Sequence, residues 1–203
     1  GTLKTSPEMA EILGRAGISQ DDAVLIYGEC QPCGGGPSAA TYVYWIMKYL
    51  GHRNVSLLDG GMDDWVKAGY PTSAQAQHMS AADYNPSLET DLLASYSFVK
   101  GGGAQIIDAR GEAEFEAGSI PCSINIPYDL VLEGKKIKDD VALSQLFSSL
   151  DKKRPVVVYT NTGVKASMIW LALTLLDYDA SIYSWRDWQA NSPSDIPEKM
   201  DGK

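Results

Sequence analysis

The sequence predicts an α/β protein of two domains, each with three layers (α/β/α) and a mostly parallel sheet. Two observations carry this prediction. A plan of strand, loop, helix and strand occurs twice along the 203 residues, and such repetition is typical of parallel sheets. The strand segments are also continuous apolar runs, as expected for strands that are buried on both faces.

The first repeat begins with the apolar run over residues 23–27. A glycine-rich loop follows, then a helical stretch over 38–50 and a second strand over 55–58. The aromatic residues of that helix recur at helical spacing and are expected to serve packing. They are Tyr42, Tyr44, Trp45 and Tyr49.

The second repeat has a strand over 155–159, a loop from Thr160 to Gly163, a helical stretch over 164–176 and a strand over 180–183. Further elements are expected ahead of it: strands over 104–110 and 123–127, and a helix over 141–150.

Ahead of the first repeat only one helix is predicted, with Ser6 as N-cap, Pro7 in its first position and Glu8 as a first-turn acid. We therefore expect the first domain to be incomplete at its N-terminus. Its opening strands would come from a longer protein or from another chain.

These patterns divide the chain into the C-terminal portion of a first domain over 1–72, a linker over 73–90 and a second domain over 91–203. The linker is assigned by its richness in Ala, Ser and Gln.

Composition argues against several classes of protein. A net charge of −9 without a basic cluster argues against nucleic-acid binding. No apolar run approaches the roughly 20 residues of a membrane span. Three cysteines do not make a disulfide framework in a chain of this length, so the compartment stays open between cytoplasm and periplasm.

The loop of the first repeat carries Cys30 and Cys33 just before a helix. Unpaired amides and the helix dipole at such a place stabilise a thiolate and an anionic substrate. The histidines, His52 and His78, lack metal-ligand spacing to this pair, and His52 is expected to serve the turn that contains it. We expect neither a metal nor a cofactor.

Four stretches together resemble the tandem-domain rhodaneses, the thiosulfate and 3-mercaptopyruvate sulfurtransferases. They are residues 33–39, 58–71, 108–121 and 159–167. The resemblance implies that a loop cysteine takes sulfane sulfur from an anionic donor, holds it as a persulfide and passes it to cyanide or a thiol. No metal or general base is needed.

Two registers are possible for the sulfur carrier. Alignment on the helix start gives Cys33 the family spacing to Gly36 and Ser38, with the amides of Gly34 and Gly35 beside it. Alignment on the strand tyrosine favours Cys30. We prefer Cys33, because the anion pocket is built from amides entering the helix. A redox dithiol, half of a shared metal site and inert thiols remain alternatives for the pair.

In the second loop the family's usual cysteine position holds Thr160, which cannot form a persulfide. This loop is therefore predicted to be inactive, although it could bind an anion. Such a site would use Thr160, Asn161, Thr162, Gly163 and Lys165.

Three further expectations concern structure. Arg110 should pair with Asp108 or Glu114, and Cys122 should be a small buried residue in a turn. Trp65, Trp185 and Trp188 should pack at the sheet.

The leading function is a sulfurtransferase for thiosulfate or 3-mercaptopyruvate. The rival is an inactive rhodanese-like binding module whose Cys30 and Cys33 form a redox switch. A phosphatase is disfavoured, because no arginine follows Cys33 before the helix.

Overall fold

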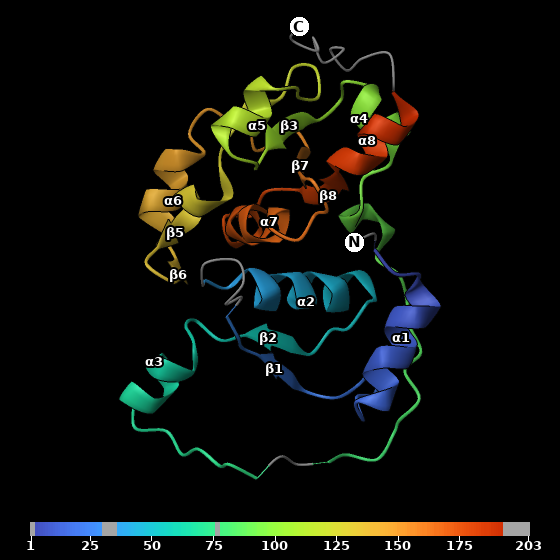
Figure 1. The fold of residues 1–203 in the computed structure, drawn as a ribbon, viewed down its shortest axis with the longest axis vertical. Helices are drawn as coiled ribbons and strands as arrows, with labels where there is room; N and C mark the ends of the chain where they lie inside the picture. The colour runs from blue at the N-terminus through green and yellow to red at the C-terminus, as the bar shows by residue number, and fades with distance from the viewer. Residues whose placement is uncertain (1–2, 30–35, 76–77, 193–203) are drawn as a thin grey trace, which may run out of the picture. The chain divides into compact units, whose positions relative to one another are not determined.

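The computed structural model describes residues 3–29, 36–75 and 78–192. Its helices are α1 (Ser6–Arg15), α2 (Ser38–Tyr49), α3 (Met62–Lys67), α4 (Tyr96–Lys100), α5 (Glu112–Glu116), α6 (Asp140–Leu146), α7 (Ala166–Leu175) and α8 (Trp185–Asn191) (Figure 1). Its strands are β1 (Val24–Ile26), β2 (Val55–Leu57), β3 (Gln105–Asp108), β4 (Ile124–Asn125), β5 (Leu132–Glu133), β6 (Lys136–Ile137), β7 (Val156–Thr160) and β8 (Ala180–Ser184). Two 3₁₀ turns, η2 (Thr90–Leu92) and η3 (Tyr128–Val131), complete the described elements.

The chain divides into two compact units. Unit 1 comprises Gly1–Asp91 together with Leu132–Ile137, and unit 2 comprises Leu92–Val131 together with Lys138–Lys203. Both predicted repeats are present as β1-α2-β2 and β7-α7-β8, with a parallel strand pair in each. The predicted α/β class with mostly parallel sheets is confirmed.

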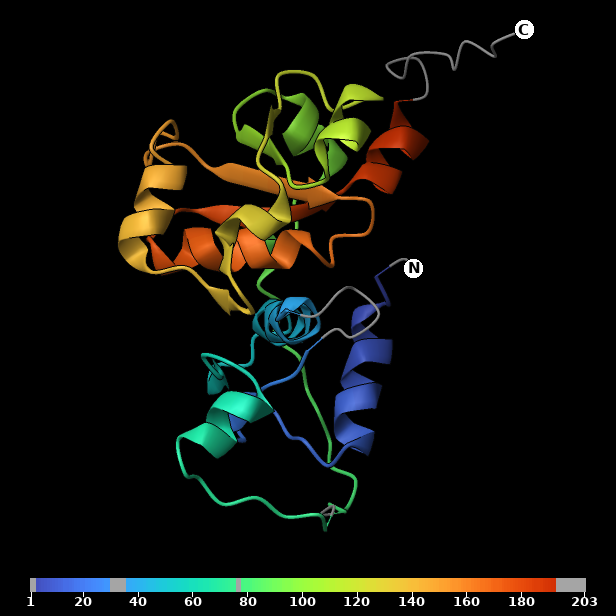
Figure 2. The same cartoon turned by 60° about the vertical axis from the view of Figure 1, so that its left-hand side comes forward.

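Unit 2 is built on a parallel sheet with the strand order β4-β3-β7-β8. All five residues of β7 are buried, because the sheet has helices on both faces (Figure 2). Helix α7 is apolar around its whole circumference and eight of its residues are buried, as expected for a helix inside a core. The apolar run predicted over 155–159 thus forms one of the two inner strands of the sheet, where both faces of a strand are buried.

The core of unit 2 brings the predicted tryptophans under the sheet. Trp185 is 7% exposed and Trp188 is 3% exposed. They share one buried cluster with Val99, Ala104, Ile106, Ile120, Val157, Tyr159 and Tyr183.

Unit 1 has a smaller sheet in which Val24 pairs with Val55 and Ile26 with Leu57. Helix α2 packs on both strands, and its rings stack along the helix: Tyr42 on Trp45 at 5.8 Å and Trp45 on Tyr49 at 5.5 Å. The expected packing role of these rings agrees with Trp45 being 1% exposed.

The first helix begins one residue earlier than predicted. Its N-cap is Thr5, and Ser6 is the first helical residue. The Thr5 amide donates to Glu8 Oε2 at 2.8 Å, which is the return bond of a capping box. The prediction of Ser6 as N-cap was wrong, because the Thr5-to-Glu8 spacing fits the capping box and the Ser6-to-Glu8 spacing does not.

The segment predicted as a linker is attached to unit 1 in its second half. Ala82 N donates to Gly14 O at 2.9 Å, and Glu89 N donates to Tyr49 O at 2.9 Å. Tyr84 is buried and its hydroxyl lies 3.1 Å from His52 Nδ1. Nε2 of this fully buried histidine lies 2.8 Å from Asp22 O, so His52 ties the segment into the unit rather than only shaping a turn.

A hairpin formed by Leu132–Ile137 belongs to unit 1, although the segments on either side of it belong to unit 2. Strands β5 and β6 are antiparallel, with Leu132 opposite Ile137 and Glu133 opposite Lys136. A two-residue turn joins them, and Gly134 takes a φ of 62° there, a conformation that glycine adopts without strain.

Candidate functional site

The cysteine loop joins β1 to α2. Its central residues 30–35 lie outside the described residues, and with them the predicted Cys30, Cys33, Gly34 and Gly35. Both flanks of the loop are described: Glu29 on the strand side and Gly36 on the helix side.

The chain enters α2 through a left-handed residue. Gly36 has a φ of 80°, which a residue with a β-carbon adopts only at a cost. Pro37 is the N-cap, and its carbonyl accepts from Thr41 N at 2.8 Å, so the helix begins at Ser38. The first amides of this twelve-residue helix therefore face the end of the cysteine loop with no partner inside the helix.

Ser38 stands at that helix start with a buried hydroxyl. The residue is 2% exposed, and its Oγ has no hydrogen-bond partner among the described residues. A buried hydroxyl without a partner costs free energy that a bound acceptor or donor would recover. The predicted substrate-binding residues Gly36 and Ser38 are thus brought together, with a polar group left for a ligand.

The β5-β6 hairpin contacts both described flanks of the loop. Lys135 Nζ lies 2.9 Å from Glu29 Oε2, and this partner raises the pKa of Lys135. A β-carbon on Gly36 would meet Leu132 Cδ1 at 3.5 Å. These contacts could not be predicted from the sequence, because about a hundred residues separate the partners along the chain.

The Asp59-Gly60-Gly61 stretch that follows β2 is held by Asp64. Its Oδ2 accepts from Gly61 N at 3.0 Å, and its Oδ1 lies 3.2 Å from Lys136 Nζ. The amide of Gly61 first and Lys136 second lower the pKa of Asp64. The carboxylate therefore anchors the hairpin beside the loop that follows β2.

The second loop satisfies its own polar groups. Thr160 is buried, and its Oγ1 accepts from Gly163 N at 3.1 Å. Asn161 Nδ2 donates to Glu114 Oε1 at 2.7 Å, and Asn161 O accepts from Ser184 Oγ at 3.1 Å. Thr162, which follows Asn161, is partly buried. The Thr160 hydroxyl thus serves as the acceptor for a loop amide.

Lys165 is oriented by an aromatic residue of η3. Its Nζ donates to Tyr128 Oη at 2.7 Å and lies 4.1 Å from the centre of that ring. The cation therefore has a neutral partner within unit 2, and its charge is not cancelled by this contact.

A buried network lies at the carboxyl end of β3. Arg110 Nε donates to Asp108 Oδ1 at 2.9 Å, and its Nη2 donates to Gly118 O at 2.7 Å. The guanidinium also covers the Trp185 ring at 4.5 Å. The predicted pairing of Arg110 is therefore with Asp108, and Glu114 bonds to Asn161 instead.

Tyr159 joins this network from β7, a contact that the sequence did not reveal. Its hydroxyl donates to Asp108 Oδ2 at 2.6 Å and accepts from Ile120 N at 3.1 Å. Burial, and then the bond to Asp108, raise the pKa of Tyr159. The residue directly before Thr160 is thereby fixed to β3 and to the turn at Ile120.

Cys122 lies in the turn after Ile120 and is exposed, so the expectation of a buried residue was wrong. Its φ is 63°, a left-handed conformation that glycine adopts more readily than a residue with a β-carbon. The turn directs the side chain outward.

Over the described ranges, no helix has the length and apolar character needed to cross a bilayer. In that same part of the chain, no three side chains of His, Cys, Asp or Glu gather as metal ligands would.

Comparison with known proteins identifies similar sequences. Residues 95–191 match the family described as "Rhodanese-like domain". A thiosulfate sulfurtransferase of Gallus gallus is 29% identical over 94% of this chain and 72% of its own length. A 3-mercaptopyruvate sulfurtransferase of Homo sapiens is 28% identical over 99% of this chain and 74% of its own length.

Solved structures agree with this relationship. The 3-mercaptopyruvate sulfurtransferase SseA of Escherichia coli superposes with a TM-score of 0.78 at 25% identity, over 90% of this chain and 72% of that one. Wild-type EanB shares the fold with a TM-score of 0.81 at 18% identity, over 96% of this chain and 54% of that one. Residues 95–191 thus match the rhodanese-like domain family, and the chain as a whole is similar to thiosulfate and 3-mercaptopyruvate sulfurtransferases.

Proposed function

We propose that the protein is a sulfurtransferase that carries sulfane sulfur on Cys33. The observation that carries this proposal is the start of α2, where Ser38 holds a buried hydroxyl without a partner directly after the cysteine loop. Gly36 gives the backbone its left-handed entry, and the first helical amides have no intrahelical partner. A thiolate and an anionic donor are both stabilised at such a place.

The proposed reaction has two steps, which are sulfur loading and sulfur transfer. The Cys33 thiolate attacks the outer sulfur of thiosulfate, a new S–S bond forms, and sulfite leaves with the electrons of the broken bond. Cyanide or a thiolate then attacks the outer persulfide sulfur, and the Cys33 thiolate is regenerated. 3-Mercaptopyruvate would supply the same sulfur, with pyruvate leaving and keeping the thiol proton on its methyl group.

Intact-protein mass spectrometry tests the sulfur carrier. After treatment with thiosulfate or 3-mercaptopyruvate, the wild type should gain the mass of one sulfur atom, and Cys33→Ser should gain none. Cys122→Ser is the matched control and should load normally, because this exposed thiol belongs to unit 2 and not to the loop that precedes α2. A normal mass gain in Cys33→Ser would assign the sulfur to another residue.

Cys30 is proposed as the resolving thiol. Its attack on the inner sulfur of the Cys33 persulfide would form a Cys30–Cys33 disulfide and release hydrogen sulfide. Cys30→Ser should load sulfur yet release no sulfide without an added thiol. Equal sulfide release from Cys30→Ser and the wild type would remove Cys30 from the mechanism.

Ser38 should act on the donor rather than on the cysteine. Replacing it by alanine removes the unpartnered hydroxyl while the helix start is kept, so the KM for thiosulfate should rise by about tenfold. Thr41→Ser is the control three residues further along α2, because it keeps a hydroxyl that can still donate to Ser38 O. An unchanged KM in Ser38→Ala would exclude this contact.

The second loop is proposed to be inactive in sulfur transfer. The Thr160 hydroxyl is engaged by the amide of Gly163, and no neighbouring base is bonded to it among the described residues. Anion binding by Thr160, Asn161, Thr162, Gly163 and Lys165 remains the proposed use of this loop. Lys165→Gln should then weaken sulfite binding measured by calorimetry in Cys33→Ser, and unchanged binding would refute it.

The rival proposal, an inactive rhodanese-like module with a Cys30/Cys33 redox switch, has one observation in its favour, which is the loss of the nucleophile at Thr160. It predicts no sulfur gain with either donor and a disulfide that forms and reduces reversibly. The mass measurement above therefore separates the two proposals.

We also propose that one face of unit 1 packs against a further segment, from the full-length protein or from another chain. Leu25 and Tyr27 lie two residues apart on and directly after β1, and they are 48% and 53% exposed. Met62 and Val66 of α3 are similarly open at 45% and 55%. Leu25→Asp should abolish any self-association seen by light scattering, and self-association that persists in this variant would refute pairing through this face.

The predicted boundaries, with domains over 1–72 and 91–203 and a linker over 73–90, stay a proposal. Limited proteolysis between residues 73 and 81, ahead of the attachment of Ala82 to Gly14, would support them.

A further inference from the structure

Unit 2 contains a cavity of about 580 Å³ at the amino end of its sheet. Its wall is formed where β3 and β4 begin and by the residues just before β7, so it lies opposite the end that carries Thr160. The volume falls in the usual range for small-molecule sites, roughly 300–1,000 Å³. All of its lining residues belong to unit 2, and none of them belongs to the second loop.

The inner wall of the cavity is apolar. Val99, Ile106 and Ile120 line it and are almost fully buried. Ile124 and Leu150 extend the apolar lining toward the surface. A ligand that fits this wall must therefore present a hydrocarbon body.

The charged residues of the wall are all cationic. Lys100 and Arg154 line the cavity, and no Asp or Glu is among the lining residues that the structure describes. This is unusual in a protein with 26 acidic and 17 basic residues. The positive wall selects an anion, since a cation would meet no opposite charge there.

Arg154 is held in place without its charge being neutralised. The side chain of Gln105 accepts from Asp151 N at 2.8 Å and donates to Arg154 O at 3.3 Å, which fixes the turn before β7. The guanidinium contacts Ala104 O at 3.5 Å and forms no ion pair with a described residue. It is therefore a positioned cation with donors left for a carboxylate.

Trp188 supplies an unused donor in the same wall. It is 3% exposed, and its Nε1 has no hydrogen-bond partner among the described residues. The indole groups of Trp65 and Trp170, in contrast, donate to Pro71 O and Ala180 O at 3.0 Å each. A buried indole N–H normally finds an acceptor, and a ligand oxygen in the cavity would be one.

We propose that this cavity binds a small organic carboxylate with an apolar body. The hydrocarbon part lies against Val99, Ile106 and Ile120, the carboxylate pairs with Arg154, and Trp188 donates to an oxygen of the ligand. Cys122 forms part of the wall with an exposed thiol, so its accessibility reports on occupancy. The proposal does not depend on sulfur transfer at Cys33.

The test uses 4-phenylbutyrate as the probe and its neutral amide as the matched control ligand. In a Cys30→Ser/Cys33→Ser background, the only remaining thiol is that of Cys122. Its reaction with 5,5′-dithiobis(2-nitrobenzoate) should slow as phenylbutyrate saturates the cavity and should not respond to the amide. Calorimetry gives the affinity independently of the thiol.

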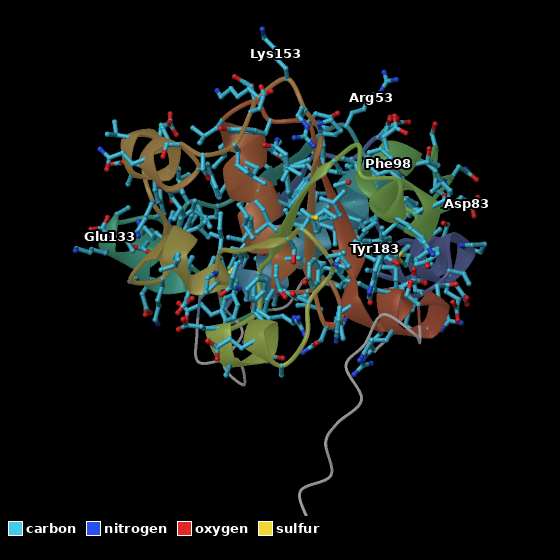
Figure 3. All side chains as sticks on the ribbon, turned by 90° about the horizontal axis from the view of Figure 1, so that it is seen from above. Arg53, Asp83, Phe98, Glu133, Lys153 and Tyr183 are labelled. Atoms are coloured by element: carbon cyan, nitrogen blue, oxygen red, sulfur yellow. The ribbon has the colours of Figure 1, made fainter. Side chains whose placement is uncertain are left out.

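Two substitutions locate the binding groups. Arg154→Gln should weaken phenylbutyrate binding by about tenfold or more, and Trp188→Phe, which keeps an aromatic ring but removes the N–H donor, by about fivefold. Lys153→Gln is the charge-matched control, because Lys153 does not line the cavity and points away from the body of the protein in Figure 3. Circular dichroism establishes that each variant is folded, and Arg154 is an exposed side chain whose loss should leave the core intact.

Equal affinity for acid and amide would overturn the proposal, as would binding that is unchanged in Arg154→Gln or binding that leaves the reactivity of Cys122 unaltered. Loss of binding in Arg154→Gln with retention in Lys153→Gln supports it. None of these results bears on sulfur loading of Cys33, so the two proposals fail separately.

Discussion

Removing the Tyr159 hydroxyl should destabilise unit 2 substantially. Tyr159 is fully buried, and its hydroxyl both donates to Asp108 Oδ2 at 2.6 Å and accepts from Ile120 N at 3.1 Å. Tyr159→Phe keeps the ring over the core but loses a bond to a carboxylate and leaves a buried amide without its acceptor. A bond to a charged group and an orphaned buried donor together give an expected loss of about 2–4 kcal/mol at neutral pH.

The same substitution should change how stability depends on pH. Burial and the bond to Asp108 raise the pKa of Tyr159 in the folded protein, so the folded state keeps this proton after the unfolded chain has lost it. The contribution of the hydroxyl is therefore complete below pH of about 10, the ordinary tyrosine value. Above that pH it should decline by about 1.4 kcal/mol per pH unit, and the gap between wild type and Tyr159→Phe should narrow.

Urea denaturation followed by circular dichroism measures the difference in free energy of unfolding between wild type and Tyr159→Phe at several pH values. Hydrogen exchange of the β7 amides verifies that the loss is in unit 2. Tyr70→Phe is the matched control, because Tyr70 is 57% exposed and no hydrogen bond of its hydroxyl is found among the described residues. The reasoning fails if Tyr159→Phe stays within about 0.5 kcal/mol of this control, or if the gap does not change as the pH rises past 10.

Three further substitutions probe single features. Cys122→Gly should stabilise the protein by about 0.5–1 kcal/mol by relieving the φ of 63°, as seen in the urea midpoint, and a lower midpoint would contradict the strain. Asp139→Ala removes the N-cap side chain that accepts from Ala142 N at 2.8 Å. It should lower the free energy of unfolding by about 1 kcal/mol and speed hydrogen exchange of the α6 amides. Asp140→Ala is the control and should cost less, because its side chain does not make this bond. His52→Phe should cost about 2–3 kcal/mol in thermal unfolding, because Tyr84 loses its buried partner; a neutral result would show that the bond adds nothing.

Local patterns predicted most of the fold. The run 155–159 became a strand because its apolar residues suit a position buried on both faces, and α2 begins at Ser38 as its pattern indicated. Asp108 was one of the two partners expected for Arg110, since it lies two residues away, and Glu114 was the other. Periodicity and short-range contacts can be predicted from the sequence alone, because they do not depend on which distant segments pack against an element.

Long-range contacts could not be predicted in the same way. Nothing near Tyr159 in the sequence indicates Asp108 as a partner 51 residues away, and nothing near Lys135 indicates Glu29. The exposure of Cys122 was missed for a related reason. Burial of a small thiol is an average tendency, whereas a left-handed turn fixes the direction of this one.

The β5-β6 hairpin means that the chain passes from one unit to the other three times, after Asp91, after Val131 and after Ile137. A cut within residues 73–90 would therefore not release two self-contained halves. The N-terminal fragment would lose Leu132 and Lys135, which flank the cysteine loop, and the C-terminal fragment would keep them without that loop. The N-terminal fragment would be an incomplete version of unit 1, whereas the C-terminal fragment would contain all of unit 2 together with a hairpin that belongs to unit 1. Restoring unit 1 would require the two fragments to reassociate through this hairpin.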